Sequence, residues 1–255
     1  MNYPMKFALN LNRLPLMYNC HIIILAAGRG SRMKSELPKV MHEIGGVPML
    51  SKVIEGASKV SDDITIVYSE PLVPYLSQYQ DYKLVLQEEP LGTAHAVFCA
   101  VDKKMPGKIL VLYADNPFLS SRVMEGLLLH LDHQKADVAS LAFITDNPEG
   151  YGRVITDENS NFIKIQECKD ATSLEKQVKL CNSGIMAFGP GIAQTVLSII
   201  MQEKVNQEYY LTDVISVATA LGGRVTFMVA ENNNEVIGVN TREELEVARG
   251  IIDLT

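Results

Sequence analysis

The sequence HIIILAAGRGSRM, residues 21–33, decides how this chain folds. The apolar run His21–Leu25 is typical of a buried β-strand. The small residues Ala26 to Gly28, followed by Gly30, let the backbone approach a ligand closely, and their N–H groups can cradle phosphate oxygens. The stretch therefore predicts a strand followed by a phosphate-binding turn.

Two cations follow this turn, Arg32 and Lys39, and they suit a triphosphate that must be both held and neutralised. The alternative is an ordinary strand-to-helix turn with two solvated basic residues, which we rank lower because the turn is rich in glycine. The stretch lacks the Gly-Lys-Ser/Thr ending of a P-loop. Met33 also stands where a dinucleotide-binding G-x-G-x-x-G turn needs its third glycine. These differences argue against both of the commoner phosphate loops.

Composition excludes several classes of protein. The 255 residues, 47% of them hydrophobic, suffice for one α/β domain with a sizeable core. A net charge of −7 disfavours a general nucleic-acid binder, and no apolar run approaches the roughly 20 residues of a membrane helix. Neither a secretory signal nor cysteines at metal-binding spacing are evident, so we expect a cytoplasmic protein with free thiols and no nucleic-acid or membrane partner.

Strand-like and helix-like segments alternate through the first part of the chain. The expected strands are residues 21–25, 63–69, 83–86, 108–113 and 137–145. The expected helices are residues 48–59, 93–103 and 120–130. This alternation predicts an α/β fold with a Rossmann-like, mixed but mostly parallel sheet flanked by helices, and ligands at the carboxyl edge of the sheet.

The second part of the chain has a different pattern. Residues 152–157 and 161–167 predict a β-hairpin around the turn Glu158-Asn159-Ser160. The remaining expected elements are strands at 179–188 and 224–230, an apolar helix after 189–191, and helices at 211–221 and 241–252. We therefore expect an extension of unknown role at residues 1–16, followed by a single domain over 17–255.

The apolar strand expected at Lys108–Tyr113 is closely followed by a carboxylate, Asp115. Such a carboxylate can hold Mg²⁺, which prefers oxygen ligands and bridges to substrate phosphates. The alternative is that Asp115 begins a turn before Pro117 or caps the next helix. A neighbouring phosphate turn would favour the metal.

Several motifs resemble those of sugar-phosphate nucleotidyltransferases. The turn L-A-A-G-R-G-S-R-M and its continuation L-P-K-V-M-H are similar to the branch of bacterial N-acetylglucosamine-1-phosphate uridylyltransferases. Six further segments resemble that branch in the same order: QEEPLGTAH at 87–95, GYGR at 150–153, ECKDAT at 167–172, CNSGI at 181–185, EYYLTD at 208–213 and IGVNTR at 237–242. The resemblance runs from about Ile22 to the last helix.

The resemblance implies a Mg²⁺-dependent enzyme that makes UDP-N-acetylglucosamine and pyrophosphate from UTP and N-acetylglucosamine 1-phosphate. It also implies a nucleotide-binding half over about 20–145 and a sugar-binding half over about 146–255. The implied catalytic residues are Arg32 and Lys39, and the metal ligands are Asp115 and Asn240. The implied nucleotide-binding residues are Leu25, Ala26, Ala27, Gly28, Gln87, Gly92 and Thr93. The implied sugar-binding residues are Tyr113, Ala114, Gly152, Glu167, Asn182 and Thr212.

Purely structural alternatives exist for four of these positions. Gly92 and Thr93 could form only a turn and a helix N-cap, and Asn240 could cap the closing helix. Without the resemblance, Glu167 would be interpreted as an exposed charge at the end of a strand.

Departures from the pattern leave other functions open. Ala114 replaces a glycine and Cys168 a histidine, while Asp115-Asn116 is similar to the G-D-N of thymidylyltransferases. Another sugar 1-phosphate or another nucleoside triphosphate is therefore possible, as is a regulatory protein that binds nucleotide sugars without turnover. The sequence contains no hexapeptide repeats of a left-handed β-helix, so we expect no acetyltransferase activity from it. It does not indicate an oligomeric state.

Overall fold

The computed structural model describes residues 18–102, 105, 107–202 and 208–252. The expected N-terminal extension lies outside these residues. A nine-stranded sheet dominates the fold, and its main path has the order β11-β7-β10-β6-β1-β4-β5. The strands on this path are β1 (Cys20–Leu25), β4 (Ile64–Tyr68), β5 (Lys83–Leu86), β6 (Lys108–Tyr113), β7 (Val138–Ile144), β10 (Leu180–Phe188) and β11 (Val225–Val229).

Strand direction confirms the predicted mixed, mostly parallel sheet. Four of the six pairings along the main path are parallel, and only β10 runs antiparallel, between β6 and β7. The predicted hairpin is also present, because β8 (Arg153–Thr156) pairs with β9 (Phe162–Gln166) and joins the sheet beside β10. No left-handed β-helix occurs among the described residues.

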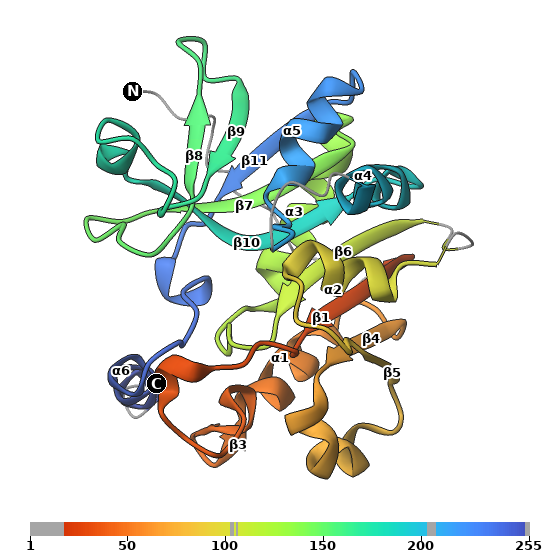
Figure 1. The fold of residues 1–255 in the computed structure, drawn as a ribbon, viewed down its shortest axis with the longest axis vertical. Coiled ribbons are helices and arrows are strands. Elements are labelled where there is room, and N and C mark those ends of the chain that lie inside the picture. Colours follow the sequence, from red (N-terminus) through yellow and green to blue (C-terminus); the bar gives the residue numbers. More distant parts are fainter. Residues whose placement is uncertain (1–17, 103–104, 106, 203–207, 253–255) are drawn as a thin grey trace.

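Helices cover both faces of the sheet (Figure 1). Along β1 the side chains alternate, so that Ile22 and Ile24 join the core cluster formed with α1 (Met49–Ala57) and α3 (Ser121–Gln134). Ile23 and Leu25 face the opposite cluster, which contains α2 (Thr93–Ala100), α4 (Ile192–Gln202) and α5 (Asp213–Ala220). Burial on both faces explains why the sequence of β1 is continuously apolar.

A third, smaller cluster brings the last helix against the first half of the chain. Helix α6 (Arg242–Ile252) packs Leu245 and Ala248 on Met33, Ile44 and Met49, beside the short strands β2 (Glu43–Ile44) and β3 (Val47–Pro48). This packing returns the C-terminal segment to the turn after β1.

A reciprocal cap starts α6. The Glu244 N–H donates to Thr241 Oγ1 (3.1 Å), and the Thr241 N–H donates to Glu244 Oε2 (3.1 Å). The alternative in which Asn240 caps this helix is therefore wrong, and its side chain is available for other contacts.

Some element boundaries differ from the predictions. Helix α2 ends at Ala100 because Val101 is extended, whereas α3 continues to Gln134 and ends where Lys135 adopts a left-handed conformation. Five 3-10 helices were not predicted: η1 (Ser31–Met33), η2 (Lys39–Met41), η3 (Glu70–Tyr79), η4 (Glu175–Gln177) and η5 (Asn233–Glu235). Among the described residues, no helix is long and apolar enough to cross a membrane.

The packing predicts a strong contrast between two adjacent residues of β7. Phe143 is fully buried and makes an edge-to-face contact with Tyr151 at 4.9 Å, whereas Ile144 is 39% exposed. We expect Phe143→Ala to lower the free energy of unfolding by about 3–5 kcal/mol and Ile144→Ala to change it by about 0.5 kcal/mol or less. Urea denaturation of both variants measures the difference, and equal losses would contradict this assignment of the core.

Candidate functional site

A cavity of about 870 Å³ opens at the carboxyl ends of the central strands. Leu25 of β1 pairs with Tyr113 of β6, so the glycine-rich turn and Asp115 leave the sheet side by side. The residues predicted from the sequence that line this cavity are Leu25, Ala27, Gly28, Arg32, Lys39, Gln87, Gly92, Thr93, Tyr113, Asp115, Gly152, Glu167, Asn182, Thr212 and Asn240. Segments that lie more than 200 residues apart thus meet in one place.

The predicted catalytic and metal-binding residues contact one another. Lys39 donates a hydrogen bond to Asn240 Oδ1 (3.0 Å) and forms an ion pair with Asp115 Oδ2. Arg32 donates to the same Asn240 oxygen at 3.0 Å. The Lys39 and Asp115 side chains are only 12% and 13% exposed, so this pair is largely shielded from water, whereas Arg32 is exposed.

Two further contacts attach the Asn240 segment to the end of β6. The Val239 N–H donates to the Asp115 carbonyl (2.8 Å), and Asn116 Nδ2 donates to the Val236 carbonyl (2.9 Å). Asn116 is buried and lines the cavity, although we did not predict it as a site residue. Its position directly after Asp115 at a strand end was the available signal.

Two glycines in the turn after β1 allow close approaches: Gly28 leaves space for a ligand, and Gly30 leaves space for the Lys39 side chain. A Cβ atom added to Gly28 would meet nothing within 4 Å, so its backbone is open to a ligand in the cavity. Gly30 has a φ of +58°, and a Cβ there would lie 2.6 Å from Lys39 Cβ. Only glycine combines this conformation with so close an approach.

Gln87 and Gly92 form one side of the cavity. The Gln87 side chain is buried, and its Nε2 donates to the Gly92 carbonyl (3.0 Å) and lies 3.1 Å from His95 Nδ1. A Cβ on Gly92 would lie 2.4 Å from the Tyr209 carbonyl oxygen, so the loop before α5 packs tightly here. His95 is thus a hydrogen-bonded residue of α2.

Thr93 and Tyr113 connect this side to the centre of the cavity. Thr93 does not cap α2, because its Oγ1 accepts a hydrogen bond from the Leu211 N–H (2.9 Å) while Gly92 occupies the N-cap position. Burial raises the pKa of Tyr113 far above its ordinary value, so its hydroxyl remains protonated at neutral pH. A Cβ on Gly184, whose φ is +90°, would lie 2.7 Å from the Tyr113 ring.

The predicted sugar-binding residues include two hydrogen-bonded pairs. Thr212 Oγ1 donates to Glu167 Oε1 (2.7 Å), and the Asn182 N–H donates to the Gly152 carbonyl (2.8 Å). Ser140 also donates to Asn182 Oδ1 (2.7 Å). Glu167 is therefore held in place rather than free at a strand end.

Ala26 and Ala114 are the two predicted residues that do not line the cavity. Both side chains are buried in the core, and their backbone N–H groups already donate to the carbonyls of Val67 (2.8 Å) and Leu25 (3.0 Å). Any contact of these residues with a ligand remains a prediction.

The side chains that line the cavity carry more negative than positive charge, which disfavours binding of an anionic ligand. Five carboxylates line it, against three cations: Asp115, Glu149, Glu167, Glu208 and Glu244 against Arg29, Arg32 and Lys39. We did not predict Arg29, Glu149, Glu208 or Glu244 as site residues, because each lies in a loop or at a helix start. A phosphate-rich ligand therefore needs additional positive charge or a local concentration of the cations.

The protein oxygens near Lys39 suit a magnesium ion that substrate phosphates also coordinate. Asp115 Oδ2 and Asn240 Oδ1 converge on one ammonium nitrogen, which places two oxygen donors around a single cation-sized position. The described residues include no group of three or more His, Cys, Asp or Glu side chains that could hold a metal alone. The donor set therefore fits a metal whose remaining ligands come from substrate and water.

The cysteines do not contribute a nucleophile to this cavity. Burial raises the pKa values of Cys20 and Cys181 to about 11, so both are thiols at neutral pH. All four cysteines are free, as predicted.

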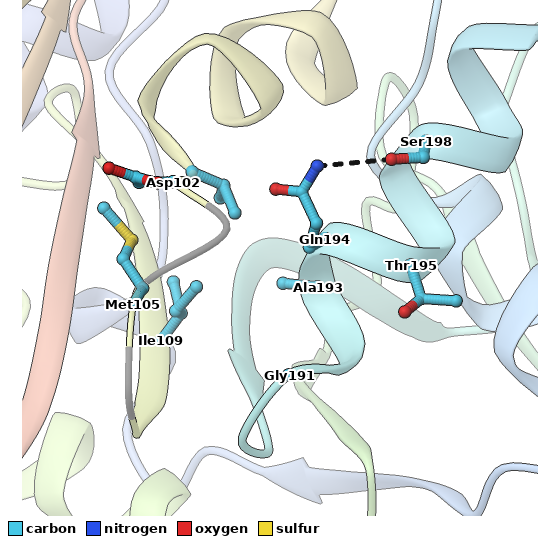
Figure 2. Close-up of a pocket in the computed structure, with 9 residues that line it drawn as sticks. Asp102, Met105, Ile109, Gly191, Ala193, Gln194, Thr195 and Ser198 are labelled. Carbon is cyan, nitrogen blue, oxygen red and sulfur yellow. Dashed lines mark hydrogen bonds between the residues drawn. The ribbon is translucent and has the colours of Figure 1, made fainter.

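A second, smaller cavity of about 380 Å³ lies between the end of α2 and the start of α4 (Figure 2). Met105, Ile109 and Ala193 line it together with Gln194, whose Nε2 donates to Ser198 Oγ (3.3 Å). It contains none of the site residues that we predicted. The larger cavity is therefore the candidate functional site.

The chain belongs to the family of MobA-like NTP transferase domains, whose model matches residues 22–166. This match contains β1, the glycine-rich turn, Asp115 and the β8–β9 hairpin. The chain is therefore a nucleotidyltransferase domain, and this cavity is the candidate for its active site.

Relatives named "Bifunctional protein GlmU" match most of the chain. The protein from Gluconobacter oxydans is 39% identical over 230 residues, which are 90% of this chain and 51% of that protein. The protein from Fervidobacterium nodosum is 40% identical over 228 residues, or 88% and 48%. The chain thus spans about half the length of the curated relatives it matches.

Solved structures share the fold at low sequence identity. A Bacillus anthracis protein described as a glucose-1-phosphate thymidylyltransferase superposes with a TM-score of 0.70 at 21% identity, covering 91% of this chain and 94% of the other. A 4-diphosphocytidyl-2C-methyl-D-erythritol synthase from Anaerococcus prevotii gives 0.65 at 16%, covering 92% and 98%.

The approach of Gly30 to Lys39 generates a prediction with a matched control. Gly46 also has a positive φ, +75°, but a Cβ there would meet nothing within 4 Å. We expect Gly46→Ala to cost about 1–2 kcal/mol of stability through backbone strain alone. Gly30→Ala should cost roughly 1–3 kcal/mol more, because it also displaces Lys39. Denaturant unfolding compares the two variants, and equal losses would show that the contact with Lys39 is unimportant.

Proposed function

We propose that this protein joins UTP to N-acetylglucosamine 1-phosphate, giving UDP-N-acetylglucosamine and pyrophosphate. The observation that carries the proposal is the meeting of Arg32, Lys39, Asp115 and Asn240 beside an open glycine-rich turn, with Lys39 and Asp115 largely buried. Membership of an NTP transferase family and the similarity to the proteins named GlmU support it.

The reaction needs alignment and charge neutralisation more than acid–base chemistry. An oxygen of the sugar phosphate is already an anionic nucleophile, and in-line attack at the α-phosphorus breaks the bond to the departing pyrophosphate. Lys39 would steady the α-phosphate and Arg32 the pyrophosphate, with the open backbone at Gly28 against the phosphates. His95, which hydrogen-bonds Gln87, has no part in this scheme as a base.

Asp115 and Asn240 would hold Mg²⁺, which neutralises developing charge on the phosphates when bound. The five carboxylates around the cavity give a physical reason for such a cation, since three basic residues do not balance them and a triphosphate together.

The Gln87 contacts support recognition of a uracil base. Its Nε2 can give one proton to the Gly92 carbonyl and the other to His95 Nδ1. With the amide assigned in this way, Oε1 is left as an acceptor, which suits a base that presents a ring N–H such as uracil. Cytosine lacks that proton, so the same amide would recognise it less well.

Neutral and anionic hydrogen-bonding groups support binding of a sugar in the same cavity. Gly152, Glu167, Asn182 and Thr212 face the cavity, where they could bind hydroxyl and N-acetyl groups. Residues of about 20–145 would then serve the nucleotide and those of about 146–255 the sugar, within one domain. We place this chemistry in the cytoplasm, where both substrates are available.

A pyrophosphate-release assay tests the proposal directly. We expect turnover with UTP, Mg²⁺ and N-acetylglucosamine 1-phosphate, its loss on addition of EDTA, and much lower kcat/KM with CTP because of Gln87. A panel of nucleoside triphosphates and sugar 1-phosphates provides the comparison. Turnover only with another pair would reassign the substrates, and binding without any turnover would favour a regulatory protein.

Substitutions of Arg32 test its assignment to the phosphates. Arg32→Ala should lower kcat by roughly 100-fold or more, as loss of a donor to a developing charge does. Arg32→Lys should recover only part of this, because an ammonium cannot donate two parallel hydrogen bonds to pyrophosphate oxygens. Arg122→Ala is the control, because Arg122 is an exposed arginine of α3 that does not line the cavity. If kcat is unchanged in both Arg32 variants, the phosphate assignment is wrong.

A further inference from the structure

Lys39 lies at the position that the proposed function gives to a metal ion. Its ammonium group contacts Asp115 Oδ2 and Asn240 Oδ1 together, and these are the two oxygens assigned to Mg²⁺. An ammonium and a hard divalent cation both prefer such oxygens, but they cannot occupy the same point between them.

We propose that Lys39 is a substitute cation that fills the metal position in the substrate-free protein and must leave it before the metal binds. The identity of the metal rests on the proposed function, whereas the competition rests on the contacts of Lys39. Lys39 thus has two positions: one against Asp115 and Asn240, and one against substrate phosphate.

The surroundings of Asp115 explain why a substitute is needed. Asp115 is only 13% exposed and shares the cavity with four other carboxylates, Glu149, Glu167, Glu208 and Glu244. A shielded carboxylate without a partner is costly, so the ammonium stabilises both the charge and the orientation of its oxygens. Among the described residues, Arg32 donates to Asn240 Oδ1 whereas Lys39 forms the ion pair with Asp115, so Lys39 is the one of these two cations that neutralises the carboxylate.

The position of Lys39 in the chain makes such an exchange feasible. Its backbone is fixed at the start of η2, and its Cβ is confined by Gly30. The three methylene groups beyond Cβ let the ammonium group move by rotamer changes alone while the backbone stays in place. The turn that would bind phosphate lies on that same side, since Gly30 is in contact with Lys39.

Because Lys39 and the metal compete for one position, binding of the metal is coupled to binding of the phosphate-containing ligand. A metal alone must displace Lys39, so it binds weakly to the empty cavity. A phosphate-containing ligand that attracts Lys39 frees Asp115 Oδ2 and removes one of the two donors to Asn240 Oδ1, the other being Arg32. By linkage, a bound metal frees Lys39 for the phosphate. The protein would therefore take up metal and nucleotide together.

Binding of Mn²⁺ to the substrate-free protein tests the competition without turnover. We expect Lys39→Gln to bind Mn²⁺ roughly tenfold more tightly than the unaltered protein, as measured by the electron paramagnetic resonance signal of free Mn²⁺. The surface lysine variant Lys59→Gln, which loses only an exposed pair with Glu55, should bind like the unaltered protein. Adding Asp115→Asn to Lys39→Gln should abolish the gain. Unchanged or weaker binding by Lys39→Gln would overturn the proposal.

A second measurement on the unaltered protein covers the case in which Lys39→Gln fails to fold. Amine acetylation followed by mass spectrometry should show Lys39 labelling more quickly at Mg²⁺ concentrations high enough to displace it. Labelling of Lys59 should not change. Protection of Lys39 that persists at saturating Mg²⁺ would contradict the exchange. Because neither measurement needs substrate, failure here is distinguishable from failure of the proposed uridylyltransferase activity.

Discussion

The parallel pairing of β1 with β6 is the constraint on which the site depends. It places Leu25 beside Tyr113, so that the glycine-rich turn and Asp115 leave the sheet next to each other. Both strands are buried and are covered by helices on both faces, which fixes this register against a shift of one residue. The ion pair between Lys39 and Asp115 then connects the two loops.

The rest of the cavity is built outward from this pair. Val239 and Asn116 attach the C-terminal segment to the end of β6, and Thr241 with Glu244 caps α6, which leaves Asn240 free to face Lys39. On the far side, β10 runs antiparallel between β6 and β7 and carries Asn182. The elements that follow β6 therefore reach the same edge of the sheet from the other direction.

Much of the fold could be predicted because strand and helix periodicities are local. The central strands are continuously apolar, and the hairpin around residues 158–160 carries its own turn signal. The helix limits at Ala100 and Gln134 were missed because Val101 and Lys135 adopt conformations that their residue types do not demand. The 3-10 helices that present Arg32 and Lys39 are short and have no periodicity to detect.

The sequence predicted which residues belong to the candidate site, but not which of their side chains contact one another. All of the predicted site residues except Ala26 and Ala114 line the cavity, whereas the contact of Lys39 with Asn240 spans 201 positions in the sequence and has no local signal. Asn116 was missed for a similar reason, since its partner is the Val236 carbonyl, 120 positions away. Ala26 and Ala114 show the opposite case, because a motif position does not reveal that its N–H is already used within the sheet edge.

Lys39 and Asp115 would support nucleotidyl transfer together, Lys39 at the α-phosphate and Asp115 through the metal, so that neither works fully without the other. A double-mutant cycle on kcat/KM, with UTP and N-acetylglucosamine 1-phosphate, tests it most directly through Lys39→Gln, Asp115→Asn and the combined variant. If Lys39 and Asp115 depend on each other in this way, kcat/KM of the combined variant should be scarcely lower than that of the slower single variant. Losses that multiply, as they do for independent sites, would contradict the account.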